Sequence, residues 1–164
     1  MKRTIQVTAR RIVRQLIAKG YTVGTAESCT GGGIAAALTS ISGSSACVRG
    51  GVVSYATEVK EEVLGVKQKT IARDGVVSEQ TVTEMALGAQ RVLNCDYAVA
   101  TSGISGPTGG TLEIPVGTVW MAVASPDGTV RTYCMTGKDE GRTKNTQNAV
   151  EIALLLLLDA IEKG

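Results

Sequence analysis

The segment Thr25-Ala26-Glu27-Ser28-Cys29-Thr30-Gly31-Gly32 decides the fold class, because it joins a β-prone run to a helical one. Residues 21–26 favour a strand, and the glycine-rich turn 28–33 leads into the apolar run 34–38, which favours a helix. A strand, a tight loop and a helix in this order are typical of an α/β protein.

The rest of the chain extends this pattern in both directions. Apolar residues recur at three- and four-residue intervals from Ile5 to Ile17, which predicts a helix that ends at Gly20. After the turn we expect a strand over 50–55, helices over 57–64 and 82–93, strands over 97–101, 117–124 and 129–135, and a helix over 142–161. The turn Ser125-Pro126-Asp127-Gly128 predicts that the last two strands are antiparallel. The sequence therefore predicts one domain, residues 1–164, with a three-layer α/β/α architecture and a mixed parallel and antiparallel sheet.

Composition limits the classes of function. Hydrophobic residues make up 43% and charged residues 20%, as in soluble globular domains. With 3% aromatic residues and a net charge of +2, neither a base-stacking platform nor a polyanion track is expected, so we expect no nucleic-acid partner. The apolar stretch 152–158 is shorter than the roughly 20 residues of a membrane-spanning helix, and no signal peptide is visible, so we expect a cytoplasmic protein without a membrane partner.

The sequence contains no histidine. This excludes Ser-His-Asp and Cys-His catalysis and removes the commonest transition-metal ligand. The cysteines Cys29, Cys47, Cys95 and Cys134 are far apart and form no C-x-x-C pair, which predicts reduced thiols rather than a zinc or redox site. We therefore expect no metal and no cofactor, and a hydrolase with this sequence needs a base other than histidine.

Ser28 is a candidate nucleophile, because it lies where a strand ends and a helix begins. Backbone N–H groups and the dipole at a helix start favour negative charge, so the amides of Cys29, Thr30 and Gly31 are candidates for binding an oxyanion. Ser28 and Thr30 are also typical N-caps, and the turn lacks the lysine of a phosphate-binding P-loop. Cys29 is a rival nucleophile if its pKa is lowered, or else a small buried residue. The residues alone leave these alternatives open.

Lys60 is the best placed candidate for the base. A lysine can activate a hydroxyl if burial or a nearby cation keeps it neutral. Tyr55 ends the predicted strand and Lys60 starts the next helix, so their side chains can share one pocket mouth. The alternative is a solvated surface lysine, because the neighbouring Glu58, Glu61 and Glu62 favour its charged form.

The segment Ser102-Gly103-Ile104-Ser105-Gly106-Pro107-Thr108-Gly109-Gly110 is too rich in glycine for regular structure. Glycine permits close approach of the backbone to a ligand. Ser102, Gly103, Ser105 and Gly106 are therefore candidates for binding a nucleotide phosphate or ribose, and the alternative is a solvent loop without a ligand.

These motifs together resemble the CinA C-terminal domain family, whose stand-alone members are the nicotinamide-nucleotide amidases. The matching motifs span about residues 5 to 135 and are Thr25 to Gly32, Gly43-Ser44-Ser45, Gly51-Val52-Val53-Ser54-Tyr55 with Lys60, Gly75-Val76-Val77-Ser78 with Met85-Ala86, Ser102 to Pro107, and Pro115-Val116-Gly117-Thr118-Val119. The resemblance implies hydrolysis of the carboxamide of nicotinamide mononucleotide to nicotinic acid mononucleotide and ammonia, within pyridine-nucleotide salvage. It also implies a Ser-Lys mechanism assisted by Tyr, which carries over to Ser28, Lys60 and Tyr55, and a homodimer or higher homo-oligomer.

The sequence departs from the family after Gly137. Many relatives carry Gly-Asp-Arg followed by further arginines, whereas this chain has Gly137-Lys138-Asp139-Glu140-Gly141-Arg142-Thr143-Lys144. If that segment binds the substrate phosphate, Arg142 or Lys144 must do so. Two other functions stay open: a nucleotide-binding or regulatory module without turnover, and an amidase for a related carboxamide.

Overall fold

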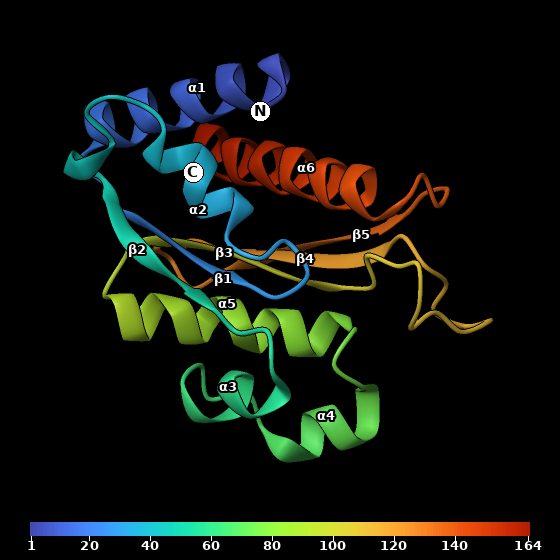
Figure 1. The fold of residues 1–164 in the computed structure, drawn as a ribbon. Helices are drawn as coiled ribbons and strands as arrows, with labels where there is room; N and C mark the ends of the chain where they lie inside the picture. The colour runs from blue at the N-terminus through green and yellow to red at the C-terminus, as the bar shows by residue number, and fades with distance from the viewer.

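A five-stranded mixed sheet forms the middle layer of the structure, a computed structural model that describes residues 1–164 (Figure 1). The strands are β1 (Val23–Glu27), β2 (Val48–Val53), β3 (Tyr97–Gly103), β4 (Thr118–Ala124) and β5 (Val130–Thr136), in the order β2-β1-β3-β4-β5. Strand β1 pairs in parallel with β2 and β3, whereas β3 with β4 and β4 with β5 are antiparallel. The predicted mixed sheet and the predicted antiparallel pair are confirmed.

Helices cover both faces of this sheet (Figure 1). On one face lie α1 (Arg3–Lys19), α2 (Gly33–Thr39) and α6 (Arg142–Lys163). On the other face lies α5 (Glu79–Leu93), with α3 (Thr57–Glu62) and α4 (Gln68–Asp74) beyond it. A single 3₁₀ turn, Ser44–Ala46, precedes β2. The three-layer α/β/α architecture is therefore confirmed.

Each face of the sheet has its own apolar core, because buried strands present side chains to both helical layers. The larger cluster joins α1, α2 and α6 to the sheet around residues such as Ile12, Leu16 and Leu157. The smaller cluster, between α5 and the sheet, consists mostly of alanines. These small side chains allow α5 to lie close to the strands. No helix of the protein is both long enough and apolar enough to cross a bilayer.

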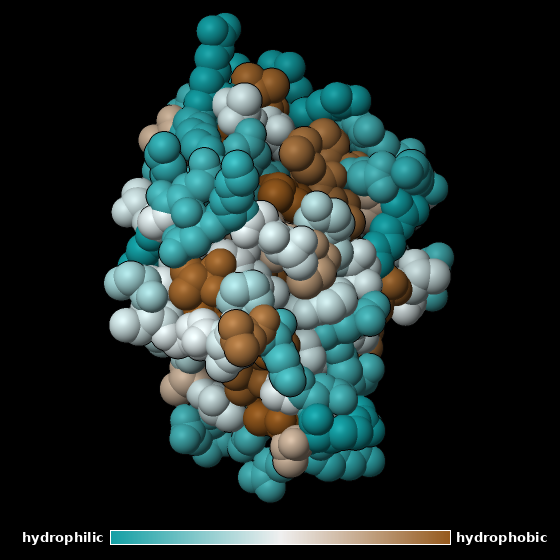
Figure 2. Space-filling view, turned by 90° about the vertical axis from the view of Figure 1, so that its right-hand side faces the viewer, coloured by the Kyte–Doolittle hydropathy of each residue, from teal (hydrophilic) through white to brown (hydrophobic).

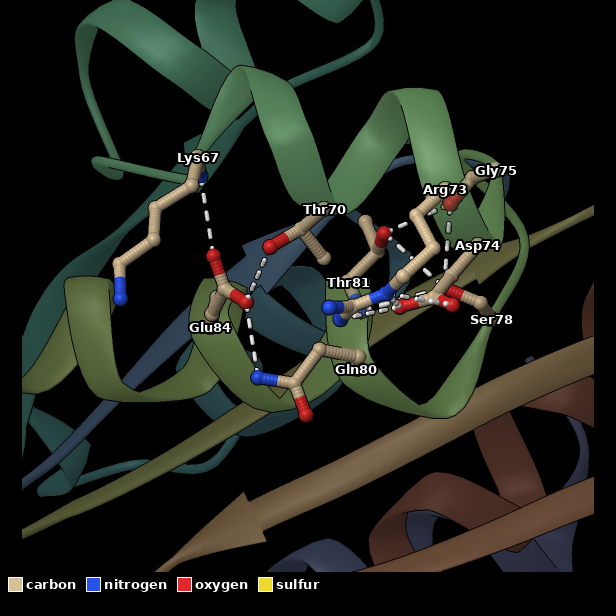
Figure 3. Close-up of polar contacts among 9 residues, drawn as sticks. All are labelled: Lys67, Thr70, Arg73, Asp74, Gly75, Ser78, Gln80, Thr81 and Glu84. Carbon is tan, nitrogen blue, oxygen red and sulfur yellow. Dashed lines mark hydrogen bonds and ion pairs between the residues drawn. The ribbon is translucent and has the colours of Figure 1, made fainter.

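The sequence does not predict α4, because its residues are mostly polar and show no apolar period. Contacts with α5 hold it in place (Figure 3). The carboxylate of Glu84 accepts hydrogen bonds from the amide of Lys67 (2.9 Å), the hydroxyl of Thr70 (2.8 Å) and the side chain of Gln80 (2.8 Å). Partial burial opposes ionisation, but these bonds lower the pKa of Glu84. Ser78 accepts a bond from the amide of Thr81 (3.2 Å) and is the N-cap of α5.

The connections that leave β1 and β2 run over opposite faces of the sheet. Helix α2 links β1 to β2 on one face, and α5 lies between β2 and β3 on the other. Open α/β sheets bind ligands at the carboxyl ends of strands where the connections diverge in this way. These strand ends lie on the right-hand side of Figure 1, which Figure 2 shows face-on. Apolar and weakly polar residues occupy much of the middle of that face, with hydrophilic residues above and below.

Candidate active site

Ser28 directly follows β1, and hydrogen bonds to β3 fix its main chain. Its amide donates to the carbonyl of Thr101 on β3 (3.1 Å), and the residue is only 9% exposed. The chain then turns through Gly31 (φ 59°) and Gly32 (φ 97°), whose left-handed backbone favours glycine. Helix α2 begins only at Gly33. Ser28 therefore lies on the turn between strand and helix, as the sequence predicts, and α2 starts within one residue of the predicted position.

Lys60 reaches Ser28 from α3. Its Nζ atom lies 2.9 Å from Oγ of Ser28, 2.7 Å from the carbonyl oxygen of Ser54 and 3.4 Å from that of Tyr55. The residue is 3% exposed, so the alternative of a solvated surface lysine does not describe it. Strand β2, after which Ser54 follows, and helix α3 together bring the amine to the end of β1.

Burial explains the electrostatics of Lys60. Removal from water disfavours the charged amine and lowers the pKa of Lys60, and the coulombic effect of Cys29 opposes this shift. The neighbouring glutamates form no ion pair with Lys60. Glu58 and Glu62 are exposed, and Glu61 accepts a hydrogen bond from Gln68 instead (3.4 Å).

Tyr55 and Arg142 meet at the outer side of this pair. The Tyr55 side chain is 62% exposed, and its hydroxyl accepts a hydrogen bond from Nη2 of Arg142 (3.0 Å). Nη1 of Arg142 donates to the carbonyl of Gly106 (2.7 Å). The Tyr55 hydroxyl forms no hydrogen bond with Ser28 or Lys60, so Tyr55 contacts Lys60 only through its carbonyl. Lys144 is exposed and forms no hydrogen bond with these groups.

The first turn of α6 anchors the loop that follows β3. Asn145 is buried, and its side-chain amide donates to the carbonyl of Ser105 (3.0 Å) and to Asp139 (2.9 Å). The Ser105 hydroxyl donates to the carbonyl of Cys29 (3.4 Å). Asn145 therefore ties the loop to α6, and Ser105 ties the loop to the turn that carries Ser28. The sequence gives no signal for this role, because a polar residue in a helix is usually exposed.

Ser102 and Gly103, which the sequence predicts to lie in a loop, instead form the end of β3. The Ser102 hydroxyl is buried and donates to the carbonyl of Val76 (2.7 Å). A Cβ atom at Gly103 would lie 2.5 Å from the carbonyl oxygen of Thr118 and 2.7 Å from Cα of Val119. Glycine is needed at position 103 because β4 packs so closely against it. Ser102 and Gly103 therefore both make contacts within the protein.

Glu27 is the residue of this region that the sequence analysis missed. Its buried carboxylate accepts bonds from the amides of Ile34 (2.8 Å) and Ala35 (3.0 Å) and from the hydroxyl of Thr30 (2.7 Å). The first amides of α2 are therefore not free to bind an anion. The predicted oxyanion donors, the amides of Cys29, Thr30 and Gly31, lie before these residues in the turn.

The predicted oxyanion donors differ in their availability. The Gly31 amide already donates to the carbonyl of Ser28 (3.0 Å), whereas the amides of Cys29 and Thr30 have no acceptor within the protein. The Thr30 side chain contacts Thr101 of β3 (2.8 Å) as well as Glu27. Of the three predicted amides, those of Cys29 and Thr30 can still donate to a ligand.

Cys29 lacks the lowered pKa that a thiolate nucleophile requires. Burial, with a smaller effect of Glu27, raises the pKa of Cys29 to about 12, although its own backbone, Lys60 and Arg142 act in the opposite direction. The thiol is therefore protonated near neutral pH. No group of three or more His, Cys, Asp or Glu side chains is arranged to hold a metal ion.

Comparison with known proteins places this arrangement in a family. Residues 5–161 match the family model described as the CinA C-terminal domain. The sequence is 46% identical to nicotinamide-nucleotide amidohydrolase PncC of Escherichia coli (strain K12) over 146 residues, which cover 87% of this chain and 88% of that protein. It is 54% identical to PncC of Enterobacter agglomerans over 117 residues, which cover 71% of each chain. The crystal structure of the competence/damage inducible protein CihA from Agrobacterium tumefaciens aligns with a TM-score of 0.96 at 43% identity, covering 98% of this chain and 97% of that one. The chain therefore belongs to the CinA C-terminal domain family.

Proposed function

We propose that this protein hydrolyses the carboxamide of nicotinamide mononucleotide to nicotinic acid mononucleotide and ammonia. The name of the Escherichia coli relative, nicotinamide-nucleotide amidohydrolase, supports this substrate. The observation that carries the proposal is the buried contact of 2.9 Å between Nζ of Lys60 and Oγ of Ser28. A hydroxyl nucleophile beside a neutral amine supplies the chemistry of amide hydrolysis in a chain without histidine.

Lys60 acts as the general base in this proposal. A neutral amine has two N–H donors and one lone pair. The carbonyls of Ser54 and Tyr55 accept the two donors, and the lone pair then faces the Ser28 hydroxyl. Lys60 takes the hydroxyl proton as Oγ attacks the carboxamide carbon, and it returns that proton to the departing nitrogen, which leaves as ammonia. Water then attacks the nicotinoyl ester, with Lys60 as its base, and releases Ser28.

The turn after Ser28 stabilises the negative charge on the carboxamide oxygen. The amides of Cys29 and Thr30 are the proposed donors, because both are free of protein acceptors. The loss of one such donor typically costs about 10²- to 10³-fold in kcat.

Arg142 is the proposed contact for the substrate phosphate. A guanidinium has five N–H donors, and only one bond each to Gly106 and Tyr55 is formed here. Gly106 lies next to it, and the preceding Ser105 is the other proposed contact from this loop. Tyr55 assists in two ways: its carbonyl holds the Lys60 amine, and its hydroxyl holds Arg142.

The test is incubation with nicotinamide mononucleotide, with ammonia and nicotinic acid mononucleotide measured together. Wild type and the control variants Ser40→Ala and Lys69→Met, both at exposed positions, should form both products. Ser28→Ala and Lys60→Met should form neither above background. A wild-type protein that binds the nucleotide without releasing ammonia would instead support the regulatory alternative, and turnover of a different carboxamide would change the substrate.

We also propose that the protein forms a homodimer or a higher homo-oligomer and that it is located in the cytoplasm. Leu112 is the most exposed large apolar side chain, at 103%, and it lies in a turn closed by bonds between Thr111 and Ile114 (2.8 and 3.0 Å). The family resemblance implies the oligomer, and Leu112 is the position chosen to test it. Light scattering should give a dimer or larger for wild type and a smaller species for Leu112→Asp. A monomeric wild type would contradict the oligomer, and cell fractionation tests the location.

A further inference from the structure

Glu27 is a fully buried carboxylate that directly precedes the proposed nucleophile. A buried charge is tolerated only where hydrogen bonds or counter-charges replace water. Glu27 forms no ion pair. The amides of Ile34 and Ala35 and the hydroxyl of Thr30 bind it instead, at 2.7 to 3.0 Å. Since these amides carry the positive end of the α2 dipole, they compensate the carboxylate.

Hydrogen bonds of Glu27 connect the turn that carries Ser28 to three neighbouring parts of the fold: α2, β3 and the segment after β2. The carboxylate connects the end of β1 to the first turn of α2. Thr30 bridges it to Thr101 on β3 (2.8 Å). The main-chain carbonyl of Glu27 accepts the amide of Ser54 (2.8 Å), and the carbonyl of Ser54 accepts Nζ of Lys60. Both members of the Ser-Lys pair are therefore held relative to Glu27.

We infer that Glu27 is a positioning residue of the proposed amidase: its carboxylate fixes the turn so that Ser28 stays within hydrogen-bond reach of Lys60. The inference rests on the proposed Ser-Lys function. Glu27 contacts neither Lys60 nor the Ser28 hydroxyl with its side chain, so it acts through the turn. Its charge adds to the effect of burial in raising the pKa of Cys29.

Glu27→Gln is the most informative variant. The side chain keeps its shape and one carbonyl acceptor, but its NH₂ group must face an N–H or O–H donor where the second carboxylate oxygen was. The turn then loses at least one hydrogen bond, and Cys29 loses the neighbouring carboxylate charge. Misplacement of a reacting group by about 1 Å can cost about 10²-fold in rate, so we expect kcat to fall by about 10- to 100-fold with little change in KM.

Two reactivity measurements separate positioning from simple stabilisation. Ser28 labelling by a fluorophosphonate probe needs no nucleotide, and Glu27→Gln should slow it by the same factor as kcat. Alkylation of Cys29 by iodoacetamide, mapped by peptide mass, should become faster. The control is Ala36→Gly, at an exposed position of α2, which weakens the helix while the side chain that it removes takes no part in the bonds to Glu27. It should lower the melting temperature and leave both labelling rates unchanged.

The outcomes distinguish the positioning role of Glu27 from the proposed hydrolysis of nicotinamide mononucleotide. If Glu27→Gln labels Ser28 as fast as wild type, the positioning role is wrong, whatever the substrate. If Cys29 alkylation does not accelerate, the contribution of Glu27 to the raised pKa of Cys29 is wrong. If wild type labels at Ser28 but does not hydrolyse nicotinamide mononucleotide, the proposed substrate is wrong while Glu27 can still be judged. If Glu27→Gln does not fold, Thr30→Val removes the hydroxyl that bridges Glu27 to Thr101 and keeps both bonds from α2, and an unchanged labelling rate there overturns the positioning role.

Discussion

The Nζ atom of Lys60 lies 2.9 Å from Oγ of Ser28 and contacts no carboxylate. Its other two contacts are main-chain carbonyls at the end of β2. Most lysines extend into water or pair with an acid, and both settings keep the amine charged. Here burial lowers the pKa of Lys60, which is the direction that the proposed general base requires.

The kcat/KM for nicotinamide mononucleotide should rise with pH and then level off. The reaction requires the neutral amine, and burial lowers the pKa of Lys60, so the midpoint should lie below the usual lysine value of about 10.4. Below that midpoint the protonated fraction grows and the rate falls about tenfold per pH unit. A pH–rate series on wild type measures this. A rate that declines as pH rises through neutrality would contradict a neutral Lys60 base.

Lys60→Met should abolish activity without destabilising the fold. General-base catalysis is worth about 10²- to 10⁴-fold, which sets the expected loss. Met has a similar length and no charge, so it removes the cost of burying the amine, and the free energy of unfolding should stay equal or rise. Urea denaturation beside the ammonia assay checks both. The exposed Lys69→Met should change neither quantity. A large loss of stability in Lys60→Met would mean that Lys60 is mainly structural.

Cys29→Ala should retain most of the activity. Burial raises the pKa of Cys29 to about 12, so only about one thiol in 10⁴ is ionised at pH 8. Wild-type Cys29 should accordingly react slowly with iodoacetamide at that pH, as peptide mapping can measure. If Cys29→Ala is inactive and folded while Ser28→Ala is active, then the nucleophile is the thiol rather than the hydroxyl.

Local sequence patterns predict much of this fold. Helix α1 follows its apolar period and ends at Gly20, and α5 begins after its N-cap Ser78, because these signals act within a few residues. Helix α4 has no such signal, since its contact with Glu84 comes from another helix. Tertiary contacts of that kind leave no trace in a local window of sequence.

In the candidate site too, some features follow from local sequence patterns and others depend on tertiary contacts. Ser28 stands out because a strand-to-helix turn is a local pattern. The burial of Lys60 cannot be read from its neighbours, since the adjacent glutamates favour the opposite conclusion. The role of Glu27 depends on α2 folding back towards the end of β1, and that of Asn145 depends on α6 meeting the loop after β3. Both require the assembled fold.

Tyr55→Phe should raise KM more than it lowers kcat. The substitution removes the hydroxyl that holds Arg142 at 3.0 Å and keeps the carbonyl that contacts Lys60. Loss of one hydrogen bond to a charged group at an exposed position suggests an effect of about tenfold or less. Steady-state kinetics with nicotinamide mononucleotide measure it, and Arg142→Ala should show the same change more strongly. A fall in kcat of about 10³-fold with unchanged KM would assign Tyr55 to proton transfer instead.

Gly88→Ala should displace Lys60 from a distance. Gly88 on α5 faces the segment after α3, and a Cβ atom there would overlap the carbonyl oxygen of Leu64 and lie 2.8 Å from its carbonyl carbon. The backbone must move, and the amide of Val66 donates to the carbonyl of Lys60 (3.0 Å), so the shift reaches the residue that contacts Ser28. Overpacking of this kind costs about 1–3 kcal/mol of unfolding free energy.

We expect Gly88→Ala to lose activity at temperatures where circular dichroism shows it fully folded, because Lys60 is displaced in the folded state itself. Gly137→Ala is the matched control, since nothing lies within 4 Å of its added Cβ and its backbone is not left-handed. The control should keep both stability and activity. A Gly88→Ala protein as stable and as active as wild type would show that the segment after α3 adapts without moving Lys60, and that the position of the base does not depend on its packing against α5.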